Sequence, residues 1–137
     1  MTYEAKFQSS LVTWFSHTWP ELTGAFFQIN NTSTSKVAEG FIPGVSDMCL
    51  AIAPTAFIEL KMKGKAHNIK HIRCQWRWGQ DAIKRGCLFI MSHDENEIKA
   101  FITAIIDGGN YTEIMKRNTL IMGDLINNCK KSTIIIC

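Results

Sequence analysis

The stretch GFIPGVSDMCLAIAPTAFIELKMKGK, residues 40–65, contains two short apolar runs on either side of Pro54. Proline favours a turn, so we expect residues 47–53 and 55–62 to form two strands of an antiparallel hairpin. Charged side chains occur inside these runs, and a charge is costly to bury unless it is paired or bound. The hairpin therefore decides both the fold and the place where function is to be sought.

The register of this hairpin brings two carboxylates together. A turn centred on residue 53 sets position 49 opposite 57, and it sets Asp47 opposite or diagonal to Glu59, within about 5–8 Å. Strand alternation places Glu59 and Lys61 on one face, away from the apolar side chains of Ile58, Leu60 and Met62. Adjacent carboxylates repel unless a cation lies between them, and hard oxygen ligands suit Mg²⁺ or Mn²⁺. The other interpretation is an edge hairpin with a surface Glu59–Lys61 pair, which contributes little stability.

The rest of the chain alternates helical and strand patterns. Apolar spacing and capping residues predict helices over 3–18, 69–85, 94–107 and 112–127, and further strands over 25–30, 87–92 and the tail 130–137. A polar loop is expected at 30–36. This order predicts an α/β fold in which a mixed sheet is flanked by helices.

Composition and length indicate one globular domain spanning residues 1–137, with 46% hydrophobic and 20% charged residues. No apolar run approaches the roughly 20 residues of a membrane span, and no secretory signal is visible. The five cysteines are irregularly spaced and form no CxxC pair. We therefore expect reduced thiols and a cytoplasmic protein without a membrane partner.

Positive charge is concentrated in the middle of the chain. Residues 61–86 carry a net charge of +7, whereas the whole chain carries only +3. This asymmetry indicates a face that binds a polyanion, although a solvated helix face would also carry such charges. The basic residues are Lys61, Lys63, Lys65, Lys70, Arg73, Arg77, Lys84 and Arg85.

Two motifs in this region resemble a known family. The segments PGVSD (43–47) and FIELK (57–61), followed by Gln75, Trp78 and Gly86, are similar to the VRR-NUC family of PD-(D/E)xK nucleases. The resemblance covers about residues 3–92, and Ser46 departs from it where a proline often stands. It implies a restriction-endonuclease-like core of α-β-β-β-α-β order over 3–92, with a C-terminal helical extension over 93–137.

The resemblance also implies a chemical role for each motif residue. Asp47, Glu59 and the backbone carbonyl of Leu60 would bind Mg²⁺ or Mn²⁺, with Glu4 on the first helix as a further candidate ligand. Lys61 would hold the attacking water, and Gln75 would reach back from the following helix toward the same site. Phosphate contacts would come from Lys63, Lys65, Lys70, Arg73 and Arg77, which position DNA without reading its sequence.

The function implied is a Mg²⁺-dependent, structure-selective DNA endonuclease that resolves four-way (Holliday) junctions. Small stand-alone members of the family occur in phages and prophages and act as homodimers, which would place this chain in a bacterial host cytoplasm. A two-fold junction needs two active sites, so we expect a homodimer, with residues 134–136 and the last helix either forming the contact or packing on the monomer. A flap-, fork- or nick-directed nuclease and a non-catalytic DNA-binding module are the alternatives.

Two other groups of residues could form a binding site. His67, His71 and Cys74 have helical spacing and could supply three zinc ligands, but no motif supplies a fourth. Trp76 and Trp78 could stack on bases, although on one helix they diverge and at least one should lie in the core. No glycine-rich phosphate loop is present, so no nucleotide cofactor is expected.

Overall fold

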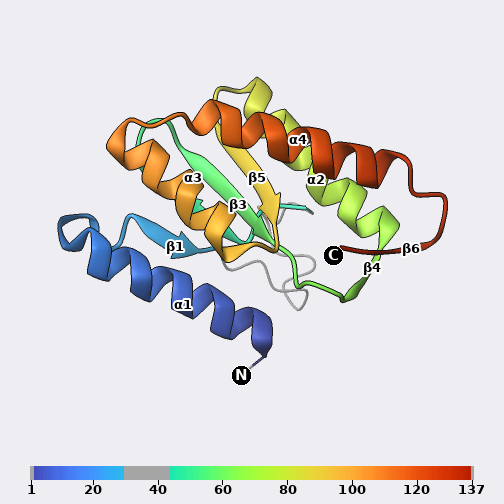
Figure 1. Ribbon diagram of the computed structural model, residues 1–137, viewed down its shortest axis with the longest axis horizontal. Helices are drawn as coiled ribbons and strands as arrows, with labels where there is room; N and C mark the ends of the chain where they lie inside the picture. The colour runs from blue at the N-terminus through green and yellow to red at the C-terminus, as the bar shows by residue number, and fades with distance from the viewer. Residues whose placement is uncertain (1, 30–43, 137) are drawn as a thin grey trace, which may run out of the picture.

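The computed structural model describes residues 2–29 and 44–136, so the predicted polar loop at 30–36 and Pro43 lie outside the described residues. A four-stranded mixed sheet is flanked by helices (Figure 1), which confirms the expected α/β class. The elements are α1 (Tyr3–Thr18), the 3-10 helix η1 (Pro20–Leu22), β1 (Phe26–Gln28), β2 (Met48–Leu50), β3 (Ala56–Leu60), β4 (Ala66–Asn68), α2 (Ile69–Lys84), β5 (Leu88–Ser92), α3 (Glu95–Asp107), α4 (Tyr111–Asn127) and β6 (Thr133–Ile135).

The main sheet has the order β1-β2-β3-β5, with β3 and β5 parallel and the other pairs antiparallel. Cys49 pairs with Phe57, which confirms the predicted register of the hairpin. The predicted strands 47–53 and 55–62 are longer than those observed. Residues 51–55 form the connection instead, because Pro54 has no N–H to donate to a ladder.

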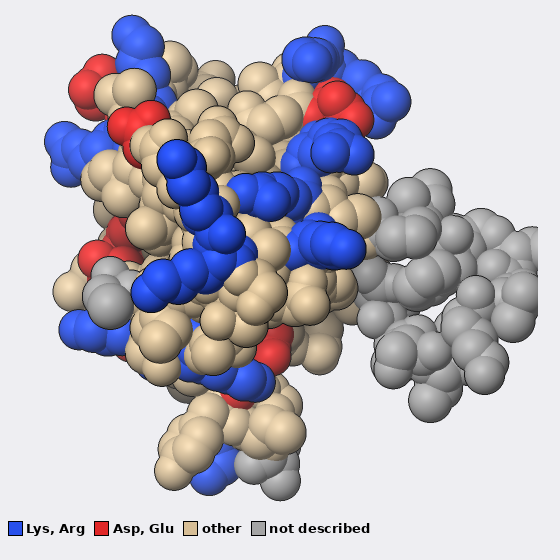
Figure 2. Space-filling view, turned by 90° about the vertical axis from the view of Figure 1, so that its right-hand side faces the viewer, with Lys and Arg blue, Asp and Glu red and all other residues tan. Residues whose placement is uncertain are grey.

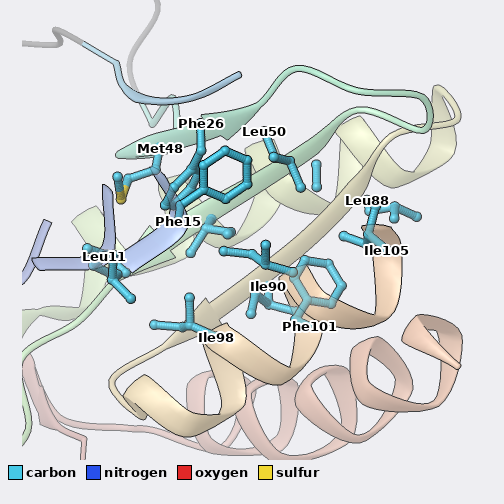
Figure 3. Close-up of a cluster of buried hydrophobic side chains, with 14 residues drawn as sticks. Leu11, Phe15, Phe26, Met48, Leu50, Leu88, Ile90, Ile98, Phe101 and Ile105 are labelled. Atoms are coloured by element: carbon cyan, nitrogen blue, oxygen red, sulfur yellow. The ribbon is translucent and has the colours of Figure 1, made fainter. Parts of the chain in front are cut away.

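One face of the sheet is covered by α1 and α3. Their apolar side chains meet those of the sheet in a buried cluster (Figure 3), to which α1 contributes Leu11 and Phe15. From β3, Ile58 and Leu60 point into this cluster, as strand alternation predicts. Glu59 and Lys61 therefore face the other side of the sheet, toward α2.

The second face is covered by α2 and the C-terminal half of α4. Trp76 of α2 lies edge-on to Phe89 of β5 with 5.9 Å between ring centroids, inside a second apolar cluster. Helix α2 also approaches β5 closely at Gly79, where a methyl group would overlap the Phe89 ring. This contact fixes the distance between α2 and the sheet, and thereby the place of every polar side chain that α2 points at β3.

Helix α4 closes the edge of the sheet at β5. The side chain of Asn118 accepts a hydrogen bond from the Met91 N–H at 3.2 Å and donates one to the Met91 carbonyl at 2.8 Å. It thus satisfies one residue of an edge strand, as a neighbouring strand would.

The strand β4 was not predicted from the sequence. It pairs with β6 in a separate two-stranded sheet that ties the tail to the start of α2, with Ile69 N–H donating to the Ser132 carbonyl at 3.0 Å. β4 has three residues after a charged turn and shows no apolar alternation, so nothing local marks it. No helix within residues 2–29 and 44–136 is long and apolar enough to cross a membrane.

Candidate active site

Asp47 and Glu59 lie next to each other at the end of the β2–β3 hairpin. Met48 pairs with Ile58, so the residues one step beyond them are Asp47 and Glu59. Gly44, three residues before Asp47, lies close against α2. It has φ +86°, and a side chain there would meet the Cys74 carbonyl of α2 at 2.9 Å. Only glycine combines that backbone conformation with that close contact.

The Asp47 carboxylate is held by the backbone of β3. Its Oδ2 accepts a hydrogen bond from the Leu60 N–H at 2.9 Å. The charge of the same carboxylate acts on the Glu59 side chain and raises its pKa. Asp47 is only half-buried, so the pair opens toward solvent on its side.

Glu59 is a buried acid, with 1% of its surface exposed. Its Oε2 lies 3.1 Å from Lys61 Nζ, and its Oε1 has no hydrogen-bond partner among the described residues. Burial raises the pKa of Glu59 well above its usual value, the Asp47 charge raises it further, and Lys61 acts in the opposite direction. When both acids are ionised, Asp47, Glu59 and Lys61 together therefore carry one net negative charge.

Lys61 is buried as well, at 6% exposure, and Gln75 Oε1 accepts a hydrogen bond from its Nζ at 2.6 Å. Gln75 thus reaches back from α2 to the hairpin, as the family resemblance implied. Asn68 begins this helix by accepting from the N–H groups of Lys70 and His71. The interpretation of Glu59 and Lys61 as a surface pair is wrong, because both side chains lie under α2.

Glu4 lies near this group but does not form a three-carboxylate metal cluster with Asp47 and Glu59, so the structure does not bring it in as the further ligand that was expected. It lies in the first turn of α1 and is partly buried. Burial raises the pKa of Glu4 and the Asp47 charge raises it further, while Lys61 and Lys65 lower it. Glu4 lines a cleft of about 580 Å³ between the start of α1 and the turn after β3, with Lys63 and Lys65 on the opposite wall.

The donor set fits a hard divalent cation. Asp47 and Glu59 supply two adjacent carboxylates, and one oxygen of Glu59 has no partner among the described residues. No group of three His, Cys, Asp or Glu side chains close enough to hold an ion occurs within the described ranges. Mg²⁺ is commonly held by one or two carboxylates together with water and substrate phosphate, so the carboxylates of Asp47 and Glu59 fit the number of protein ligands that it needs.

The interpretation of His67, His71 and Cys74 as zinc ligands on one helix face is wrong. His67 lies in β4 rather than on α2, where a helical face with His71 and Cys74 would require it. Burial lowers the pKa of His67, and the nearby Lys61 charge lowers it further. Trp76 is a core residue, and Trp78 lies edge-on to Phe57 with 4.9 Å between centroids.

The predicted DNA-binding residues divide into two groups. Lys63 and Lys65 lie in the turn beside the cleft, and Lys70 and Arg77 are exposed on α2. None of these four forms an ion pair within the described residues. Figure 2 looks onto the side of the molecule where α2, β4 and β6 lie, and Lys and Arg clearly outnumber Asp and Glu there.

Arg73 is already engaged inside the molecule. Its guanidinium donates to the Cys129 carbonyl at 2.7 Å and to the Ile126 carbonyl at 3.4 Å. These carbonyls lie at the end of α4, so Arg73 joins α2 to the C-terminus of that helix. The sequence could not separate Arg73 from its basic neighbours, because its partners are more than fifty residues away.

One polar contact of the site was not predicted. His71 Nε2 lies 3.3 Å from Gln75 Nε2, one helical turn away. The i, i+4 spacing of these residues on a predicted helix is the signal that could have revealed it.

Comparisons of this chain with models of protein families, with curated proteins and with solved structures found no match.

Proposed function

We propose that this chain is a Mg²⁺-dependent, structure-selective DNA endonuclease of the VRR-NUC type and that it resolves four-way junctions. The observation that carries the proposal is the placement of Asp47 and Glu59 side by side, next to the buried contact of Lys61 with Gln75. Buried charged groups that are only partly paired are costly to stability, and such groups concentrate at functional sites. The cluster is thus better explained by chemistry than by folding.

The Asp47 and Glu59 carboxylates and the Leu60 carbonyl would hold Mg²⁺ or Mn²⁺. The ion would supply charge neutralisation on the scissile phosphate and a more acidic bound water. Asp47 is oriented for this task by the Leu60 N–H, and Glu59 by Lys61. The groups that orient the two carboxylates thus lie at the end of β3 and directly after it.

Lys61 would act on the attacking water and on the phosphate. Its ammonium group can only donate hydrogen bonds, and two of its directions are taken by Glu59 and Gln75. The remaining donor can hold a water by its lone pair, which leaves the water protons free to transfer. Gln75 keeps the Lys61 ammonium group in this place, because without the Gln75 oxygen that group would be held by Glu59 alone.

DNA would be held by cations around the cleft. Lys63 and Lys65 flank it, and Lys70 and Arg77 extend the positive surface along α2. Contacts to phosphate provide affinity and position without base readout, so shape would select the substrate. A junction with two-fold symmetry requires two such sites, so we propose that the protein acts as a homodimer.

The proposal is tested by incubating purified protein with labelled four-way junction, flap, fork, nicked duplex and linear duplex, with and without Mg²⁺. We expect cleavage of the junction only with Mg²⁺, and faster than that of the other substrates. Lys61→Ala should abolish cleavage while leaving junction binding in EDTA within about threefold of wild type. Lys99→Ala, on α3, is the matched control and should leave both unchanged.

Each other outcome has a definite meaning. Preferential cleavage of flap, fork or nick would replace the junction as the substrate and keep the enzyme. DNA binding by wild type and Lys61→Ala without cleavage by either would identify a non-catalytic DNA-binding module. The absence of both binding and cleavage would reject the proposal altogether.

A further inference from the structure

We infer that His71 is a positioning residue of this site, which holds the Gln75 carboxamide in the orientation that presents an oxygen to Lys61. The inference rests on the proposed nuclease function and adds a residue to it that the sequence motifs do not include. His71 would act through Gln75 and Lys61 and would not itself touch DNA or metal.

Gln75 lies between two polar groups, and each end of its carboxamide meets one of them. Oε1 is 2.6 Å from Lys61 Nζ, and Nε2 is 3.3 Å from His71 Nε2. Gln75 is 8% exposed, so water gives its carboxamide little help. Both ends of the group therefore depend on protein partners.

Lys61 decides which end of the carboxamide is which. An ammonium group has donors only, so the oxygen of Gln75 must face it. The amino end of Gln75 then faces His71, and it too can only donate. His71 Nε2 must therefore carry no proton, which places the proton of the neutral ring on Nδ1.

The contact has a consequence for Lys61. The alternative in which Gln75 turns its amino group toward Lys61 sets donor against donor there, and the Gln75 oxygen then bonds His71 only if the ring proton moves to Nε2. Without an acceptor at position 71, the Gln75 amino group loses the protein partner that it has in this structure. Gln75 would then leave its present place, and Lys61 would lose one of its two acceptors.

The test compares His71→Leu with His71→Gln, because the glutamine oxygen can accept in place of the ring nitrogen. His17→Leu is the matched control, since His17 is an exposed histidine in the last turn of α1, whereas Glu4 is in the first. We expect His71→Leu to lower kcat for Mg²⁺-dependent junction cleavage about 10-fold, with KM and the thermal midpoint unchanged. His71→Gln should restore kcat to within about threefold of wild type.

Two outcomes would overturn the inference: a wild-type kcat for His71→Leu, or a His71→Gln variant as slow as His71→Leu. A second measurement does not depend on cleavage. Nitrogen-15 NMR of the metal-free wild-type protein at about pH 8, where histidine is ordinarily neutral, reports which ring nitrogen is protonated. We expect a bare Nε2 and a protonated Nδ1 at His71, and loss of this preference in Gln75→Leu.

A proton on Nε2 of His71 in the wild-type protein would contradict the inference even if the protein cleaves DNA. Conversely, a protein that cleaves no DNA would reject the proposed function, whereas a bare Nε2 would still support the role of His71 in holding Gln75. The two failures are therefore distinguishable.

Discussion

Glu59 is an acid that the fold buries beside a second acid, with Lys61 as its near cation. Removing a carboxylate from water disfavours its charged form, and the neighbouring Asp47 charge adds to the effect. Both causes raise the pKa of Glu59, and they act in the same direction. Such a group adds little to stability, which is why its presence supports the metal site proposed above.

This pKa shift predicts how stability depends on pH. An unfolded glutamate releases its proton near pH 4.3, whereas folded Glu59 keeps it to higher pH. Between these two pKa values the folded state holds more protons, so the free energy of unfolding in EDTA falls as pH rises, by at most about 1.4 kcal/mol per pH unit. Glu59→Gln should lack this contribution, and urea unfolding of both proteins from pH 4 to 8 measures the difference. Parallel pH profiles would contradict the prediction.

Added Mg²⁺ should bind at the same residue, Glu59, and raise the free energy of unfolding that rising pH lowers. A ligand that binds only the folded state stabilises it by about 2.7 kcal/mol at one hundred times its Kd. We expect Mg²⁺ to raise the thermal midpoint of the wild-type protein at pH 8 and to leave that of Glu59→Gln nearly unchanged. A wild-type midpoint that does not respond to Mg²⁺ or Mn²⁺ at any concentration would remove the metal from the proposed site.

At this scale the sequence predicted much of the site. The turn at Pro54 and strand alternation were enough to set Asp47 against Glu59, because hairpin register depends on local features. They could not predict that Glu59 and Lys61 are buried, since the cover is α2, which begins eight residues after Lys61. Burial results from tertiary packing, and no pattern inside a five-residue strand records it.

At the scale of elements, α4 completes the sheet edge and Arg73 holds α2 to it. Asn118 supplies both hydrogen bonds of Met91, and Arg73 supplies donors to the carbonyls at the end of α4. Each of these side chains belongs to a helix and satisfies the backbone of another element. The pairing of β4 with β6 is likewise a long-range contact, because the paired residues are 65 to 69 positions apart in the sequence. Sequence patterns identify single elements well, but such long-range partners leave no local signal.

Arg73 and Lys70 should therefore respond differently to substitution. Arg73→Met keeps the aliphatic stem but leaves the α4 carbonyls without their donor, and we expect it to lower the free energy of unfolding by about 1–3 kcal/mol. Lys70→Met, at an exposed position of the same helix, should change stability by less than about 0.5 kcal/mol and weaken DNA binding at low salt. Urea unfolding and DNA titration of both variants decide the matter. Equal stability of the two variants would show that the guanidinium contact is unimportant.

Asn118→Leu should be more damaging than either. It replaces a buried side chain that holds the N–H and the carbonyl of one residue, and both groups would be left without a partner. Each unpaired buried group costs about 1–3 kcal/mol, so we expect a loss of about 2–5 kcal/mol in the free energy of unfolding. Asn96→Leu, an exposed asparagine on α3, is the control and should be close to neutral. A loss below about 1 kcal/mol for Asn118→Leu would contradict the role given to this side chain.

At the scale of the whole molecule, the surface carries one further feature that bears on function. Ile121 and Leu125 of α4 and Ile135 of β6 are exposed, and a groove of about 680 Å³ runs between the end of α4 and β6. Within the described residues β6 pairs only with β4, and no strand lies on its other edge, where the Cys129 thiol donates to the Thr133 carbonyl. An open edge beside an apolar groove favours pairing with another strand, and two copies of β6 can pair antiparallel across a two-fold axis.

This apolar surface predicts the oligomeric state of the protein. Ile135 is 52% exposed, and a lysine there would place like charges against each other across the two-fold axis. We expect the wild-type protein to sediment as a dimer at micromolar concentration and Ile135→Lys to sediment as a folded monomer. Phe27→Lys, at a comparably exposed apolar position on β1, an edge strand of the main sheet, should remain dimeric.

The same variants connect assembly with chemistry. A dimer bound to a cruciform in a supercoiled plasmid can cut both strands before it dissociates and so release linear DNA, whereas a monomer cuts one strand and releases a nicked circle. Once one strand is cut, supercoiling is lost and the cruciform is reabsorbed, so a second, later encounter finds no junction. Wild type and Phe27→Lys should therefore give linear product, and Ile135→Lys nicked product. Linear product from a monomeric Ile135→Lys would separate junction resolution from this surface.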